Sequence, residues 1–220
     1  MKKVILFLAV VVFAASADAQ NSSWGIKGGV SLANVTNTNI LAEDGGKMQA
    51  GMRTSFYVGA FYEYRIDNVG ISPEIVYSSQ GTEFDSYMYF VGNEYGLVDL
   101  TIRLNYINIP IMAKLYIIKN VLSLDVGPQF GFLTGANASR EITSGINGNN
   151  SATTVSDDED VTDSFSGFDF SVGLGATLNL GKFFLISARY NLTTNGSDYS
   201  DNDKITPKNS VFQFGAGFRF

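Results

Sequence analysis

The most chemically suggestive residues in this sequence are four consecutive acidic side chains. Asp157, Asp158, Glu159 and Asp160 lie in a polar stretch rich in asparagine and glycine. Carboxylates and loop carbonyls are the hard oxygen ligands that calcium prefers. The run lacks the alternating ligands, central glycine and terminal glutamate of an EF-hand loop. We therefore weigh a calcium site against a solvated acidic loop and favour the loop.

The sequence contains no cysteine and no histidine. Without these residues the chain has no thiol nucleophile, no Ser-His-Asp triad and no zinc site of the usual kind. We therefore expect no enzymatic activity and no cofactor. The formal net charge of −6 argues against nucleic acid as a partner, because nucleic-acid binding needs a basic face.

The first 19 residues have the features of a secretory signal peptide. Two lysines follow Met1, residues 4–15 are apolar, and small residues stand at Ala17 and Ala19. The apolar run is shorter than the roughly 20 residues that a membrane-spanning helix needs. We predict cleavage between Ala19 and Gln20, which leaves residues 20–220 as one exported domain.

The rest of the chain alternates apolar and polar residues with a period of two, which predicts strands. The final stretch, residues 210–220 (SVFQFGAGFRF), is the clearest example. The expected strands are residues 24–32, 56–65, 71–78, 102–117, 122–132, 168–179, 184–192 and 210–220. The apolar face of residues 102–117 changes phase midway, so we predict a β-bulge near Tyr106 and Ile107.

The connections between these strands alternate in length. Residues 34–53, 79–101, 134–164 and 193–209 form long polar connections, and the other three connections are short. The aromatic residues of 79–101 suggest that the flanking strands continue beyond the membrane. Eight strands with this alternation predict an all-β, eight-stranded antiparallel up-and-down transmembrane β-barrel in a bacterial outer membrane. The short turns and both termini are expected on the periplasmic side.

If the aromatic faces point to lipid, charged residues face the barrel interior. They are Lys27, Glu63, Glu74, Arg103, Lys114, Asp125, Asp169, Arg189 and Arg219. Both signs are present, so we expect a paired network, because unpaired buried charges are costly. An eight-stranded barrel is only wide enough for side chains to fill it, which favours packing over a conducting pore.

Several segments resemble a known family. Residues 24–29 (WGIKGG), 106–110 (YINIP) and 127–131 (GPQFG) and the terminal Phe220 are similar to porin-family and PorT-like outer-membrane β-barrel domains. These are small barrels related in architecture to the OmpA and OmpX types of Gram-negative bacteria. The resemblance implies an outer-membrane location and, for the PorT-like branch, a helper role in protein secretion. Barrel enzymes of the outer membrane rely on a histidine, which this chain lacks.

The carboxy terminus resembles the signal by which the barrel-assembly machinery recognises its substrates during insertion. Gln213, Gly215, Phe218 and Phe220 fill the places of that signal. We interpret the chain as a monomeric, non-enzymatic barrel in outer-membrane lipid. Its role would be structural, with surface loops that bind or adhere to an extracellular or envelope protein. The alternatives are transport, as a small-solute porin or a secretion accessory, and a secreted soluble barrel that holds an apolar ligand.

Overall fold

The computed structural model describes residues 21–36, 50–92, 94–146, 152–194, 197–201, 204–206 and 208–220. Its long strands are β1 (Ser22–Thr36), β2 (Ala50–Ile66), β3 (Val69–Val91), β4 (Glu94–Ile118), β5 (Leu122–Ile146), β7 (Phe168–Leu180), β8 (Phe184–Thr193) and β11 (Lys208–Arg219). The other elements are β6 (Ala152–Asp160), the short 3-10 helix η2 (Thr162–Ser164), β9 (Ser197–Asp201) and β10 (Lys204–Thr206).

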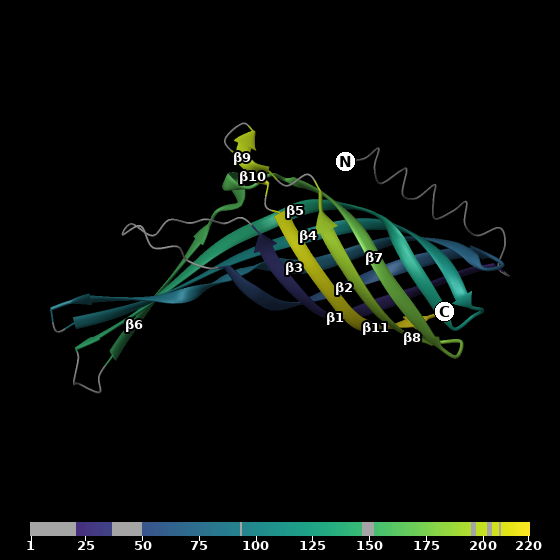
Figure 1. Ribbon diagram of the computed structural model, residues 1–220, viewed down its shortest axis with the longest axis horizontal. Coiled ribbons are helices and arrows are strands. Elements are labelled where there is room, and N and C mark those ends of the chain that lie inside the picture. Colours follow the sequence, from purple (N-terminus) through teal and green to yellow (C-terminus); the bar gives the residue numbers. More distant parts are fainter. Residues whose placement is uncertain are drawn as a thin grey trace.

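Eight of the described strands close into one antiparallel ring (Figure 1). The ring runs β1, β2, β3, β4, β5, β7, β8, β11 and returns to β1. The first and last strands close it, with Gly25 opposite Arg219 and Leu32 opposite Phe212. The predicted eight-stranded up-and-down barrel is confirmed. Within the described residues, no helix has the length and apolar character needed to cross a membrane.

Three tight turns lie together at one end of the barrel, where the carboxy terminus also lies (Figure 1). Each contains a residue with positive φ: Asp67 (52°), Asn120 (65°) and Gly181 (73°). Aspartate and asparagine tolerate the left-handed region because their short side chains hydrogen-bond locally, and glycine has no Cβ to clash. These residue types therefore allow the chain to turn back within a few residues between consecutive strands.

At the opposite end, the ring strands β3, β4 and β5 continue past the ring and, together with β6, form a projecting sheet (Figure 1). The strands β3, β4 and β5 contain 23, 25 and 25 residues, whereas roughly 9–11 suffice to cross a bilayer. The expected continuation of strands into residues 79–101 is borne out. The expectation of a plain loop at 134–164 is wrong, because β5 runs on to Ile146 and pairs with β6.

The β5–β6 hairpin forms because its residues suit a sheet. β-Branched side chains face each other across it: Ile142 lies opposite Val155, and the hydroxyls of Thr143 and Thr154 are 3.0 Å apart. Such cross-strand pairs stabilise a sheet. The high content of asparagine, glycine and acidic residues concealed this pattern in the sequence.

The predicted bulge occurs at the expected level but in the neighbouring strand. Asn105 of β4 pairs with Gly135 of β5, and Tyr106 pairs with Leu133, so the extra residue is Thr134. From Arg103 to Ile117 the strand β4 keeps its alternation of inward and outward residues, and Leu104 and Tyr106 point inward with Ala136. The apolar phase change therefore marks where the interior itself becomes apolar.

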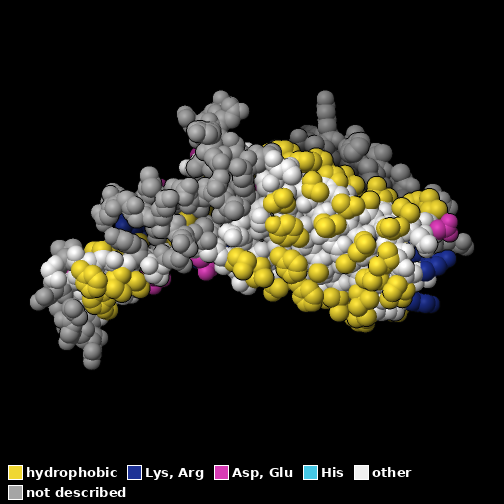
Figure 2. Space-filling model, in the orientation of Figure 1, with side chains coloured by type: hydrophobic (Ala, Val, Ile, Leu, Met, Phe, Trp, Pro, Cys, Tyr) yellow, Lys and Arg dark blue, Asp and Glu magenta, His cyan; other side chains and the backbone are white. Residues whose placement is uncertain are grey.

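Alternate residues of the ring strands point outward and make an apolar belt (Figure 2). Exposed members on neighbouring strands include Ile26, Val58, Ile75, Leu174 and Phe214. So large an exposed apolar surface is unfavourable in water and is typical of a barrel wall that contacts lipid.

Candidate functional site

The barrel interior holds two groups of ion pairs. In the first, Lys114 lies between two carboxylates, with its Nζ 3.4 Å from Glu63 Oε2 and 3.6 Å from Asp125 Oδ2. Tyr116 donates a hydrogen bond to Glu63, and Thr177 donates one to Asp125. All three charged side chains are buried. Hydroxyl donors therefore supplement a single lysine that cannot neutralise two carboxylates alone.

The second group centres on Glu74, which lies between two cations. Arg189 donates from Nη1 and Nη2 to the two carboxylate oxygens, each at 2.7 Å, and Lys27 Nζ lies 2.7 Å from Oε2. The paired guanidinium–carboxylate geometry is among the strongest hydrogen-bond arrangements in proteins. This group crosses the barrel, because its residues come from β1, β3 and β8.

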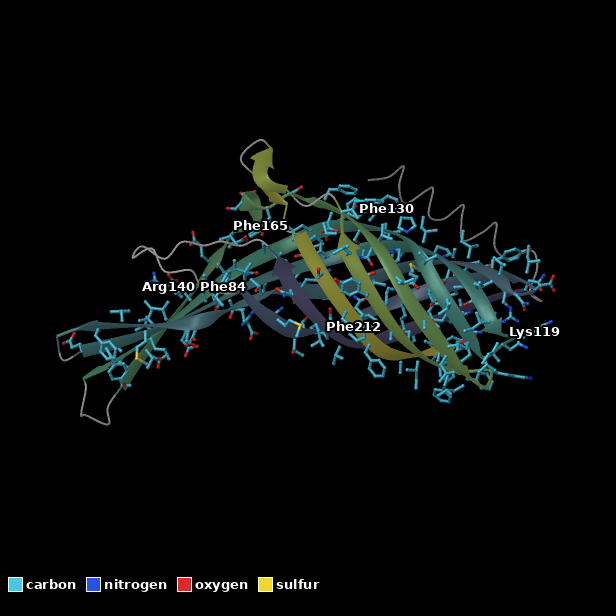
Figure 3. All side chains as sticks on the ribbon, in the orientation of Figure 1. Phe84, Lys119, Phe130, Arg140, Phe165 and Phe212 are labelled. Carbon is cyan, nitrogen blue, oxygen red and sulfur yellow. The ribbon has the colours of Figure 1, made fainter. Side chains whose placement is uncertain are left out.

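Amides and hydroxyls fill the next level towards the projecting sheet. Asn108 donates to Ser78 at 2.8 Å, Gln129 to Ser171 at 3.2 Å, and Asn209 to Gln80 at 3.2 Å. Above them, Leu104, Tyr106 and Ala136 form an apolar cluster. Val161 and Phe165, which flank η2, pack against this cluster. Phe165 is labelled in Figure 3. Side chains thus occupy the interior from the ion pairs up to an apolar cap.

The nine charged residues that the sequence assigned to the interior differ in their exposure in the structure. Lys27, Glu63, Glu74, Lys114, Asp125, Asp169 and Arg189 are buried. Asp169 accepts a hydrogen bond from Thr193 at 2.8 Å. Arg219 is half-buried at the turn end and donates to Asn179.

The interior assignment of Arg103 is wrong. Its side chain is exposed, because Leu104 and Tyr106 occupy the inward positions of β4 at this level. The apolar pair looked outward-facing in the sequence, which reversed the expected orientation of Arg103.

The carboxy-terminal residues lie on both sides of the wall. Gln213 is buried in the interior and Phe220 is exposed at the turn end. The Phe220 ring stacks on Trp24 at a centroid distance of 4.3 Å, and Phe218 lies 4.8 Å from Phe220. These rings form part of an aromatic group at the edge of the belt, as expected of an interfacial girdle. The cleavage site at Ala19 and Gln20 lies outside the described residues.

The four acidic residues first considered for calcium form no such site. They lie on β6, where successive side chains point to opposite faces, so Asp157 and Glu159 lie opposite to Asp158 and Asp160. In the described part of the chain, no group of three acidic residues is close enough to hold a metal ion. Asp160 instead accepts a hydrogen bond from the Thr162 backbone at 2.9 Å. Hydrogen bonds from the Thr162 side chain and backbone hold the pKa of Asp160 below its usual value.

The projecting sheet carries a second acidic feature that the sequence did not reveal. Asp99 of β4 lies directly opposite Glu141 of β5, and Glu83 and Asp158 lie in the next row of paired residues. These residues come from four strands. Only the strand register brings them together, so no local spacing could have indicated them.

The chain matches one protein-family model over residues 17–196, described as an outer membrane protein β-barrel domain. No curated protein matches it. Among solved structures it is similar to the attachment invasion locus protein Ail of Yersinia pestis, in complex with the heparin analogue sucrose octasulfate. The identity is 18%, 91% of this chain and 99% of Ail are covered, and the TM-score is 0.45.

Two further solved structures are similar at lower identity. For the outer membrane protein OprG of Pseudomonas aeruginosa the identity is 12%, 91% of this chain and 96% of OprG are covered, and the TM-score is 0.41. For the outer membrane protease OmpT of Escherichia coli the identity is 11%, 91% of this chain and 96% of OmpT are covered, and the TM-score is 0.32.

Proposed function

Because this chain belongs to the outer membrane protein β-barrel domain family, we propose that its projecting sheet is a surface platform that binds an extracellular or envelope protein. One observation carries this proposal: β3, β4, β5 and β6 extend together beyond the lipid-facing belt. Every residue of β6 is exposed, and among the described strands β6 pairs only with β5. An exposed strand edge offers unpaired backbone groups to an extended segment of a partner.

The packed interior supports binding over transport. Two groups of buried ion pairs lie inside the barrel, one of them crosses it from β3 to β8, and an apolar cap lies above them. A solute would have to separate these pairs, and leaving a buried charge without its partner is costly. We propose a non-enzymatic role, in keeping with a sequence that contains neither histidine nor cysteine.

The proposal includes a route to the membrane. Residues 1–19 are removed after export, and residues 20–220 form the barrel as a monomer. Gln213, Gly215, Phe218 and Phe220 are read by the barrel-assembly machinery. The short turns and both termini face the periplasm, and the projecting sheet faces outward. The aromatic end of β11 and the clustering of tight turns at that end support this orientation.

The test is adhesion by a variant that has the barrel but a shortened sheet. Residues 137–160 are replaced by a short turn, and proteoliposomes of both proteins are applied to surfaces coated with a panel of extracellular and envelope proteins. Retained heat-modifiability on a detergent gel shows that the shortened variant still forms a barrel. We expect adhesion to at least one surface by the full chain and its loss in the variant. Equal adhesion by both, or none by either, would contradict the proposal.

A further inference from the structure

One face of the projecting sheet gathers acidic side chains in two neighbouring rows. The first row crosses the sheet as Glu83, Thr101, Ser139 and Asp158, and the second contains Asp99 opposite Glu141. Directly opposed residues point to the same side of a sheet, as do residues two apart along a strand. All four carboxylates therefore share one face, which continues the lipid-facing side of the barrel. We call it the acidic face.

The opposition of Asp99 and Glu141 is unfavourable in the isolated protein, because like charges directly across a sheet destabilise it. Glu141 is exposed, and Asp99 is half-buried and accepts a hydrogen bond from Ser86. No described salt bridge neutralises Asp99, Glu141 or Asp158. The sheet thus retains a repulsion that a cationic partner would relieve.

The basic side chains near this face lie at its membrane border. Arg103 is one row closer to the lipid belt, opposite Asn137. Arg53 Nε lies 4.0 Å from Glu83 Oε1, and its guanidinium also donates to Ser79 and to the Gln80 carbonyl. These contacts hold Arg53 beside β3. Among the described residues, no salt bridge brings a cation to the centre of the acidic face.

Two further features of the same face suit a protein partner. A hollow of about 500 Å³ lies at its base, lined by Glu83, Ser86, Asp99 and Thr101 together with Met52 and Leu100. Towards the tip, the exposed side chains of Met88 and Phe90 lie opposite Leu97 and Tyr95. Figure 2 shows hydrophobic side chains gathered at this end of the sheet. Acidic and apolar areas are therefore contiguous.

We propose that the acidic face binds a basic segment of a partner protein. Lysine or arginine side chains lie over Asp99 and Glu141 and enter the hollow, and apolar side chains of the same segment contact Met88 and Phe90. Complementary charge favours this occupant, because an acidic partner would add to the repulsion already present. The inference rests on the proposed surface-binding function and names the class of its partner.

The test measures binding of a fluorescent peptide that alternates lysine and valine to the full barrel in lipid nanodiscs. The variant Asp99→Asn with Glu141→Gln removes two charges from the acidic face. The control, Asp157→Asn with Glu159→Gln, removes the same charge from the opposite face of the same sheet. We expect the first variant to bind roughly tenfold more weakly than the wild type, and the control to bind within about twofold of it. The variant Asp99→Glu keeps the negative charge at this position and should retain most of the wild-type affinity.

A second readout needs no partner. Removal of the Asp99–Glu141 repulsion should make the projecting sheet more resistant to limited proteolysis, whereas the control variant should not. Equal losses of peptide binding in the two variants would overturn the inference, since bulk charge alone would explain them. Binding of calcium instead of peptide, dependent on Asp99 and Glu141, would also overturn it. If the peptide test fails but the shortened variant loses adhesion, only the class of partner is refuted. If the shortened variant adheres as well as the full chain, the proposed surface platform itself is refuted.

Discussion

The substitution Glu74→Gln tests the account of the interior most severely. Glu74 makes three contacts of 2.7 Å with two buried cations, Lys27 and Arg189. Glutamine has nearly the same shape but no charge, so both cations lose their counter-ion inside the barrel. Removing one member of a buried pair costs about 3–5 kcal/mol, and because two cations are stranded here we expect the upper end, about 5 kcal/mol.

Reversible urea unfolding in lipid vesicles measures this cost. The single tryptophan, Trp24, lies exposed on the outer wall against Phe220, so its emission reports transfer from lipid to water. Glu83→Gln is the matched control, because Glu83 is exposed and 4.0 Å from Arg53, and it should change stability by less than about 1 kcal/mol. Lys27→Met keeps the two-bond pair of Arg189 and Glu74 and should cost less than Glu74→Gln. A Glu74→Gln barrel within about 1 kcal/mol of the wild type would refute the reasoning.

Three other outcomes follow from the same structure. Planar bilayers containing the purified barrel should show no stepwise conductance, and regular channel openings would contradict the packed interior. Replacing both Phe218 and Phe220 by alanine should lower the fraction of heat-modifiable barrel in the outer membrane several-fold, while Phe212→Ala on the same wall should not. Because the pKa of Asp160 is lowered, its bond to Thr162 is intact above the ordinary aspartate pKa and is lost as the pH falls through the lowered value. Protection of the Thr162 amide relative to its intrinsic exchange rate should therefore fall only in acid, and a pH-independent protection would refute this role.

The sequence was sufficient to predict the barrel because lipid imposes a simple rule on it. A strand in a membrane wall must show an apolar face every second residue, and tight turns need residues such as Asp67, Asn120 and Gly181. Charged residues at the other alternate positions were therefore expected inside, and seven of the nine are buried. The rule says nothing about which charges meet. Glu74 contacts Lys27 and Arg189 across the barrel, and their separation in sequence carries no signal of that contact.

The errors arise where the rule stops applying. Leu104 and Tyr106 point into the interior because the top of the barrel is closed by apolar side chains rather than water, so their apolar character reversed the predicted face of Arg103. Beyond the belt, both faces of a hairpin are solvated and the apolar alternation fades, which is why β6 resembled a loop. The acidic face depends on the register of four strands, a property that no single stretch of sequence contains.

The most direct test of the central claim is single-cysteine labelling of intact cells with a membrane-impermeant maleimide. The chain has no cysteine of its own, so each introduced thiol is the only target. Val155→Cys places the thiol on the exposed strand β6, and Lys182→Cys places it in the tight turn at the other end. A sheet that acts as a surface platform predicts labelling of Val155→Cys in intact cells, and of Lys182→Cys only after the outer membrane is opened. Labelling of Lys182→Cys alone in intact cells would contradict the account.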